Sequence, residues 1–170
     1  MELEFLRASA EDAQRIMKII GQAQEYLREQ GVNQWQNNYP NSGTVMNDIQ
    51  NEDCFVLRDN GRVVATVTVV FGGEKTYANI YDGNWSSSRE YATIHRIAVD
   101  AGYKGRGLAS VIIGNIEAMC HSRGIESIRV DTHRHNASMK KMLIKNKFTY
   151  CGIIYLADNS ERIAFEKILT

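Results

Sequence analysis

The sequence has few cysteines, almost no proline and no long hydrophobic run. The first and the last of these absences each exclude a class of protein, and the scarcity of proline leaves no sign of a domain boundary. Its 170 residues include three cysteines and one proline. Three cysteines are too few for a disulfide framework and fit a reducing compartment. No uncharged apolar run approaches the roughly 18 residues that a membrane span needs. The N-terminus carries Glu2 and Glu4 where a signal peptide would be basic, so we expect a cytoplasmic protein with no membrane partner.

An excess of charge of one sign is also absent. The 20 Lys and Arg residues balance the 20 Asp and Glu residues, which argues against a nucleic-acid partner. The balance is uneven along the chain, because residues 102–147 contain nine basic and three acidic residues. This segment therefore suits one small, highly charged anion. With 44% hydrophobic residues and no repeat or linker, residues 1–170 are expected to form a single domain.

The hydrophobic periodicity predicts a mixed α/β domain. A short strand over residues 2–7 precedes a helix that begins after Ser9 and ends at Gly31, and a second helix is expected near residues 45–49. The Asn60-Gly61 pair predicts a β-hairpin, since it supplies the positive φ angles of a tight turn. The remaining elements are strands over residues 93–99, 127–131, 148–155 and 162–168 and helices over 108–123 and 136–146. The predicted order is β-α-α-β-β-β-α-β-α-β-β.

Residues 72–90 are long for a connection in a compact domain. They contain Tyr77, Tyr81 and Trp85. Such a segment can be a substrate-facing excursion or an oligomer contact, or it can simply cover the core. The sequence leaves these alternatives open.

The segment with the clearest chemistry is a glycine-rich turn between a strand and a helix. Residues 94–99 form the strand, and Gly102, Gly105 and Gly107 follow before the helix at Leu108. Free N–H groups and the helix dipole at such a turn bind phosphate. No Gly-Lys-Ser or Gly-Lys-Thr occurs, so a P-loop nucleotidase is disfavoured, and Ser110 replaces the third glycine of a dinucleotide fingerprint.

The run Lys104-Gly105-Arg106-Gly107-Leu108-Ala109 resembles the acyl-CoA loop of the GNAT superfamily of N-acetyltransferases. Asn136 at the start of the next helix and Lys147-Phe148 after it fit the same pattern. The resemblance implies a mostly antiparallel sheet flanked by helices, and direct transfer of acetyl from acetyl-CoA to a primary amine of a small molecule or peptide. The residues it assigns to acetyl-CoA are Ile97, Ala98, Val99, Lys104, Gly105, Arg106, Gly107, Leu108, Ala109 and Asn136.

Two positions depart from the family pattern. Lys104 stands where the family has Gln or Arg, which keeps a cation but loses bidentate geometry. Leu143 stands where many members carry a tyrosine that protonates the departing thiolate. The alternative function is therefore a non-catalytic acyl-CoA-binding or regulatory domain that lacks this acid.

Acyl transfer to an amine needs a general base and a proton for the CoA sulfur. His95, on the strand before the loop, is the first candidate base, and Glu90 is the second. Strand alternation lets only one of His95 and Arg96 point into a cleft, unless a bulge changes the pattern. The alternative for His95 is a half-buried strand residue. Tyr150 is the phenol nearest to the vacant acid position, although most tyrosines at such a position only pack.

Other candidates lie outside the loop. His133 and His135 follow the strand over residues 127–131, but alternate residues diverge, so we expect no metal and interpret His133 as a substrate-orienting residue or reserve base. Cys151 is expected to be a buried thiol rather than a nucleophile. Trp35, Tyr81 and Trp85, with Tyr39, lie in the two irregular segments where the family builds its acceptor site. They are predicted to cage an amine or to form a homodimer surface.

Overall fold

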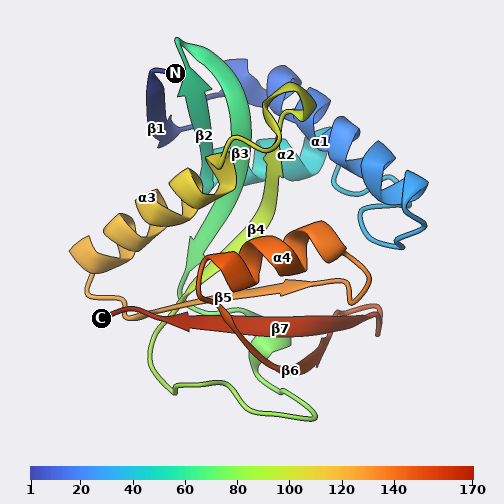
Figure 1. Cartoon of the computed structure of the whole chain (residues 1–170), viewed down its shortest axis with the longest axis vertical. Coiled ribbons are helices and arrows are strands. Elements are labelled where there is room, and N and C mark those ends of the chain that lie inside the picture. Colours follow the sequence, from blue (N-terminus) through green and yellow to red (C-terminus); the bar gives the residue numbers. More distant parts are fainter. The chain divides into compact units, whose positions relative to one another are not determined.

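The computed structural model describes all 170 residues and contains seven strands and four α-helices in the predicted order (Figure 1). The helices are α1 (Ala13–Glu29), α2 (Ser42–Gln50), α3 (Leu108–Ser122) and α4 (Ala137–Lys145). The strands are β1 (Leu3–Arg7), β2 (Cys54–Asp59), β3 (Arg62–Phe71), β4 (Ala92–Val99), β5 (Ser127–Thr132), β6 (Thr149–Tyr155) and β7 (Glu161–Ile168). Short 3-10 turns occupy Ala10–Asp12, Lys75–Tyr77 and Ala101–Tyr103.

The chain forms two compact units, and β4 and α3 each contribute residues to both. The first unit comprises residues 1–69 and 95–115, and the second comprises residues 70–94 and 116–170. The strand order β1-β2-β3-β4-β5-β7-β6 is antiparallel at β1–β2, β2–β3, β5–β7 and β6–β7 and parallel at β4–β5. The predicted mixed, mostly antiparallel α/β fold is therefore confirmed.

The β2–β3 hairpin of the first unit forms where the Asn60-Gly61 pair predicts it. Asn60 and Gly61 have φ angles of 49° and 83°, as a tight primed turn requires. The strands pair antiparallel from Asp59 opposite Arg62 to Cys54 opposite Thr68.

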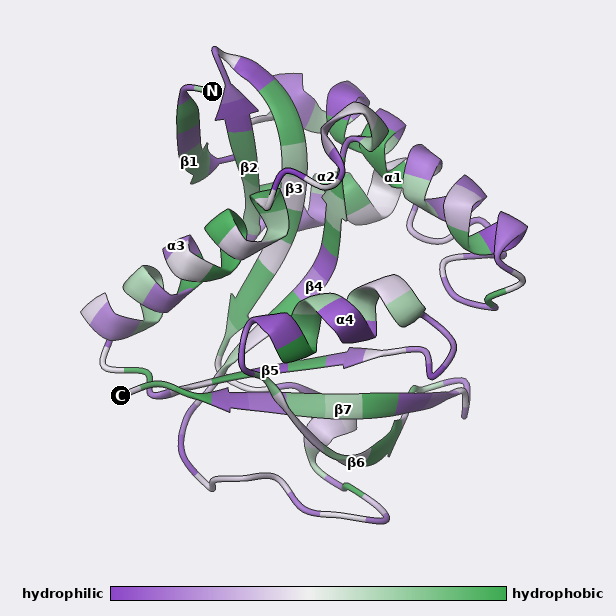
Figure 2. Cartoon of the chain, viewed as in Figure 1, coloured by the Kyte–Doolittle hydropathy of each residue, from purple (hydrophilic) through white to green (hydrophobic).

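The core of the first unit lies between these strands and the two N-terminal helices. Ile16, Ile19 and Ile20 of α1 and Val45 of α2 are at most 2% exposed, and they belong to one cluster with residues of β2, β3 and β4. Figure 2 shows hydrophobic and hydrophilic residues alternating along α1, as an amphipathic helix requires. The burial of these side chains fixes α1 and α2, and with them the loop over residues 31–41 that joins the two helices.

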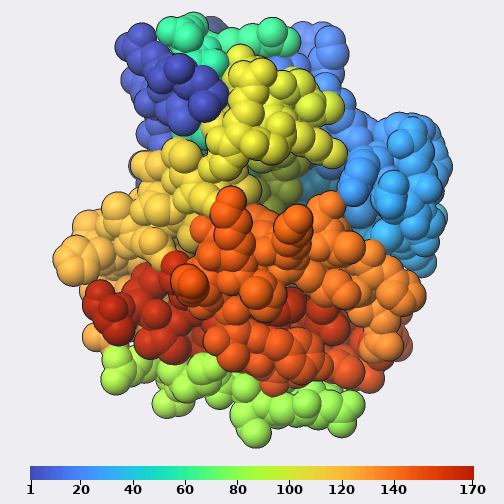
Figure 3. All heavy atoms as spheres, viewed as in Figure 1, coloured from blue at the N-terminus to red at the C-terminus, as the bar shows by residue number.

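In the second unit the strand order is β4-β5-β7-β6, and α4 is drawn next to β5 in Figure 1. Residues 72–90 cover the core of this unit. Tyr77 is 2% exposed and packs in one cluster with Ile154 and Ala164, and Trp85 packs against the same cluster. Figure 3 shows the segment as a lime-green layer along the orange and red strands. Tyr81 pairs with Ile153 in an isolated bridge and keeps 51% of its surface exposed.

Candidate functional site

The glycine-rich turn of the first unit leads directly into α3. Gly105 and Gly107 have φ angles of 78° and 76°, which favour glycine, and a Cβ at either position would meet no atom within 4 Å. The Gly107 carbonyl accepts a hydrogen bond from Val111 N at 3.2 Å, so the N–H groups of the first turn have no intrahelical partner. Unpaired N–H groups at a helix N-terminus that follows such an uncrowded turn are suited to binding an anion.

Two cations stand beside this turn, each held against an aromatic ring. Lys104 Nζ lies 3.9 Å from the ring centroid of Tyr26 in α1, and the Arg106 guanidinium lies 4.8 Å from that of Tyr103. The Tyr103 hydroxyl donates to Asp59 Oδ2 at 3.0 Å, and this hydrogen bond raises the pKa of Tyr103. The cations are therefore positioned next to the open turn before any anion arrives.

The strand before the turn contains a local irregularity at Arg96. Its φ of 48° is left-handed, which is uncommon for a residue other than glycine and interrupts the alternation of β4. His95 and Ile97 on either side are half-buried, and Ala98 is buried. Strict alternation therefore does not decide which of His95 and Arg96 faces a cleft. The side chain of Arg96 turns toward α2 and the loop over residues 31–41.

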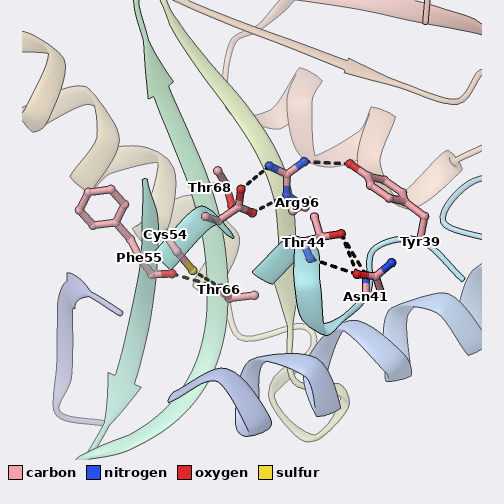
Figure 4. A network of polar contacts seen from close by, with 9 residues as sticks. Tyr39, Asn41, Thr44, Cys54, Phe55, Thr66, Thr68 and Arg96 are labelled. Atoms are coloured by element: carbon pink, nitrogen blue, oxygen red, sulfur yellow. Dashed lines mark hydrogen bonds and ion pairs between the residues drawn. The ribbon is translucent and has the colours of Figure 1, made fainter. Parts of the chain in front are cut away.

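Arg96 is the centre of a polar network that is buried at Asp48 and exposed at Tyr39 (Figure 4). Its Nε and Nη2 donate to the two carboxylate oxygens of Asp48 at 2.6 and 2.8 Å, and its Nη1 donates to the Tyr39 hydroxyl at 2.9 Å. Thr68 Oγ1 donates to Asp48 Oδ2 at 2.9 Å. Burial acts to lower the pKa of Arg96, but the bonds to Asp48 and Tyr39 outweigh it and the pKa is raised. Sequence reasoning missed Asp48, since its partners are distant along the chain.

The loop over residues 31–41 and the facing side of α1 line an open hollow of about 290 Å³. Trp35, Asn37 and Asn38 are left-handed, with φ angles of 61°, 59° and 58°. Gln24 Nε2 donates to the Pro40 carbonyl at 2.9 Å and so ties the loop to α1. No carboxylate lines the hollow, whose walls are Met17, Gln24, Arg28, Trp35, Gln36, Asn37, Asn38, Pro40, Asn41 and Ser42. Trp35, predicted to contact substrate, is therefore a wall of an amide-rich hollow.

The second unit contains three further candidates. His133 follows β5, and its Nδ1 accepts a hydrogen bond from His135 N at 3.0 Å. Burial and then the positive charge of Arg162 lower the pKa of His133. Asn136 caps α4, since its side chain accepts from Met139 N at 3.2 Å. Tyr150 is 49% exposed on β6, with its ring edge-on to Phe165.

The remaining candidates of the second unit have other surroundings. Trp85 donates from Nε1 to the Tyr77 carbonyl at 2.9 Å, and the Arg129 guanidinium lies 4.2 Å from its ring centroid. An aromatic face that already holds a guanidinium offers no cage for an amine. Glu90 is exposed two residues before β4, and Cys151 is 6% exposed.

The described side chains include no group of three or more His, Cys, Asp or Glu residues arranged to hold a metal ion. None of the helices combines the length and apolar composition needed to cross a membrane. Trp35, His95, residues 97–99 and the turn over 104–109 belong to the first unit. The second unit holds Tyr81, Trp85, Glu90, His133, Asn136 and Tyr150.

A strand that leads through a glycine turn into a helix is a geometry that suits the binding of phosphate groups at the helix N-terminus. Comparison with known proteins gives the family. The sequence profile of the Acetyltransferase (GNAT) family matches residues 18–148. The chain therefore belongs to the GNAT family of acetyltransferases, whose members use acetyl-CoA as co-substrate and act on amines.

Individual relatives agree with this assignment. The uncharacterized N-acetyltransferase YesJ of Bacillus subtilis is 23% identical over 162 residues, which cover 94% of this chain and 87% of that protein. The crystal structure of a GNAT-family acetyltransferase from Streptococcus agalactiae superposes with a TM-score of 0.89 at 30% identity, covering 99% of this chain and 96% of the other. The ribosomal-protein-S18-alanine N-acetyltransferase of Escherichia coli shares the fold, with a TM-score of 0.66 at 16% identity over 99% and 95% of the two chains.

Proposed function

We propose that this protein transfers the acetyl group of acetyl-CoA directly to a primary amine of a small molecule or peptide. The observation that carries the proposal is the open turn at Gly105 and Gly107 before the unpaired N–H groups of α3. A Cβ at either position would meet no atom within 4 Å, and in the proposed arrangement the pyrophosphate occupies this space. Membership of the GNAT family supplies the class of reaction.

The chemistry of the turn and of β4 suits acetyl-CoA. The first-turn N–H groups of α3 and the cations of Lys104 and Arg106 complement a pyrophosphate. In the proposed arrangement a backbone N–H within residues 97–99 polarises the thioester carbonyl, which lowers the cost of the oxyanion that forms there. Asn136 would add a hydrogen bond to the pantetheine arm.

The acceptor amine has to lose a proton before or during attack. We propose His95 as the base because it lies on the same strand as residues 97–99 and because an imidazole is the side chain best suited to accept a proton near neutral pH. Glu90 and His133 are the reserve candidates. The amide-rich hollow at Trp35 would hold the body of the acceptor. Arg28 is among the residues that line the hollow, and no carboxylate is. We therefore propose that the acceptor carries carbonyl or carboxylate groups, as amino acids and peptides do, and that polyamines are poorer acceptors.

Titration calorimetry with acetyl-CoA tests the placement of the cofactor. Gly107→Trp fills the open space and is expected to abolish binding, and Gly107→Ala is expected to weaken it. The matched control is Gly124→Ala at the end of α3, because Gly124 has a φ of 70° and open space around it, as Gly107 has. We expect Gly124→Ala to strain the backbone as much as Gly107→Ala does and to leave the affinity for acetyl-CoA unchanged. Wild-type affinity in Gly107→Trp would overturn the placement.

Release of CoA over a panel of amino acids, peptides and polyamines tests the reaction. Turnover with amino acids or peptides is the expected result. The competing function is a non-catalytic acyl-CoA-binding or regulatory domain, which is favoured by the buried Leu143 at the position of the family's usual tyrosine. Tight binding of acetyl-CoA without turnover on any amine would favour that alternative.

A further inference from the structure

The segment between β4 and the glycine-rich turn is attached to α1 by a buried carboxylate. Asp100 directly follows β4 and is 7% exposed. Its Oδ1 accepts a hydrogen bond from Gly102 N at 2.7 Å, and its Oδ2 pairs with Arg15 Nη2 of α1. One side chain therefore holds the backbone of the segment and joins it to the helix.

Arg15 extends this attachment to the sheet. Its Nε donates to the Val63 carbonyl of β3 at 3.0 Å, and Asp100 N donates to the neighbouring Val64 carbonyl at 2.8 Å. Burial acts to raise the pKa of Asp100, but the bonds from Gly102 and Arg15 outweigh it and the pKa is lowered. The carboxylate is therefore ionised at neutral pH and keeps its guanidinium partner.

Two further residues of α1 contact the same segment. Gln22 Oε1 accepts from Ala101 N at 2.9 Å, and the Tyr26 ring holds Lys104 Nζ at 3.9 Å from its centroid. Gln22 and Tyr26 follow Arg15 by seven and eleven residues. These spacings are close to two and three turns of a helix with about 3.6 residues per turn. The three side chains therefore form one stripe along α1, called here the α1 stripe.

The turn needs such a support because of its glycines. Gly105 and Gly107 have positive φ angles, and glycine loses more backbone freedom on folding than any other residue. Helix α1 is itself fixed, since Ile16, Ile19 and Ile20 on its inner side are at most 1% exposed. When only a fraction of the molecules has the binding geometry, the apparent affinity falls by that fraction.

We propose that the α1 stripe holds the acetyl-CoA turn in its binding geometry, with Arg15, Gln22, Tyr26 and Asp100 as positioning residues. They act through the backbone of residues 100–102 and through the side chain of Lys104. This inference rests on the proposed function, in which the turn over residues 104–109 binds the pyrophosphate. It makes the affinity for the cofactor depend on a helix that lies more than 70 residues earlier in the sequence.

Titration calorimetry with acetyl-CoA tests the ion pair. Arg15→Gln is expected to weaken binding about tenfold, as it would if about one molecule in ten kept the turn in its binding geometry. The matched control is Arg58→Gln, since Arg58 pairs with Asp12 at 3.0 Å in the same unit. The side chains of that pair are 28% and 10% exposed, against 20% and 10% for Arg15 and Asp100. Arg58→Gln should lower thermal stability as Arg15→Gln does and leave the affinity unchanged.

A pair of glutamine variants tests the stripe without breaking an ion pair. Gln22→Ala removes the acceptor of Ala101 N and keeps a strong helix former, so α1 should remain folded. Loss of this single hydrogen bond is expected to weaken acetyl-CoA binding about threefold. Gln14→Ala removes an exposed glutamine of α1 outside the stripe and should leave the affinity unchanged.

A conservative change at Tyr26 separates the ring from the bulk of the side chain. Tyr26→Phe keeps the aromatic face that holds Lys104, whereas Tyr26→Leu removes it. We therefore expect Tyr26→Leu to weaken acetyl-CoA binding more than Tyr26→Phe does. A stripe that only stabilised the fold would produce no such difference at equal thermal stability.

The outcomes distinguish the inference from the proposed function. If Arg15→Gln and Gln22→Ala bind acetyl-CoA as the wild type does, the inference fails while the proposed function stands. Equal losses of affinity in Arg15→Gln and Arg58→Gln overturn it as well, since they would reflect stability alone. If Arg15→Gln does not fold, the two glutamine variants decide. If the wild type does not bind acetyl-CoA, the proposed function fails and the inference fails with it.

Discussion

Among single residues, His133 has a pKa that its surroundings lower. Burial is the largest cause of its lowered pKa, and the charges of Arg162, His135 and Arg134 act in the same direction. Its Nδ1 already accepts a hydrogen bond from the His135 N–H, which suits a neutral imidazole. A histidine that is neutral at pH 7 can accept a proton or a hydrogen bond from a substrate.

We therefore expect His133 to titrate below its ordinary value of 6.5 when followed by NMR. Arg162→Gln removes a positive charge that lowers the pKa of His133, so it should raise the titration midpoint of His133. Since the folded state binds this proton more weakly than the unfolded state, the free energy of unfolding should fall as the pH drops below 6.5. His133→Asn should show a smaller fall between pH 7 and 5, and a midpoint at or above 6.5 in the wild type would contradict the assignment.

At the scale of elements, residues 72–90 depend on one buried carboxylate. Glu166 of β7 is 1% exposed and accepts from Ser86 N at 2.6 Å, Ser87 Oγ at 2.9 Å, Ser127 Oγ at 2.5 Å and Arg129 Nε at 3.2 Å. Arg129 in turn donates to the Ser87 carbonyl at 2.6 Å. Glu166 and Arg129 thereby attach the segment to β5 and β7.

We expect Glu166→Gln to lower the free energy of unfolding by about 3 kcal/mol, because breaking a buried ion pair leaves Arg129 uncompensated. Hydrogen exchange should accelerate first at residues 84–90. Glu126→Gln is the matched control, since Glu126 pairs with Arg89 of the same segment at the surface, with side chains 51% and 63% exposed. That change should cost no more than about 1 kcal/mol. Equal losses in the two variants would refute the role of Glu166.

The same elements show what the sequence could predict. The β2–β3 hairpin and the start of α3 were predictable because Asn60-Gly61 and Gly105 to Gly107 fix the local backbone by themselves. The position of residues 72–90 was not, because the partners of Glu166 lie up to 80 residues away in sequence. Aromatic residues occur both in loops that cover a core and in loops that face a substrate. The aromatic content of residues 72–90 therefore could not distinguish the two.

The candidate site also has a part that the sequence predicts and a part that it does not. The cofactor turn follows from glycine spacing, whereas the ion pair of Arg96 and Asp48 joins residues 48 positions apart. The left-handed backbone at Arg96 has no sequence signal either, since arginine rarely adopts it. Strand alternation alone therefore could not decide how His95 and Arg96 are oriented.

At the scale of the whole molecule, the net charge of zero conceals a local asymmetry. Residues 102–147 contain nine basic and three acidic residues, and the other residues contain 11 and 17. A neutral protein has no long-range attraction for a polyanion, but cations within a screening length of about 10 Å still act on a bound phosphate. Lys104 and Arg106 beside the open turn are the cations in that position in the first unit.

This asymmetry predicts how acetyl-CoA binding depends on salt. Raising NaCl from 20 to 500 mM should weaken binding roughly tenfold, since the added ions screen the phosphates from nearby cations. Lys104→Gln and Arg106→Gln should each weaken binding at low salt and flatten the dependence. Lys18→Gln removes the same charge from an exposed position on α1 outside this segment and should leave the slope unchanged. If Lys18→Gln flattened the slope as much as Lys104→Gln does, total charge rather than the turn would govern binding, and the local argument would fail.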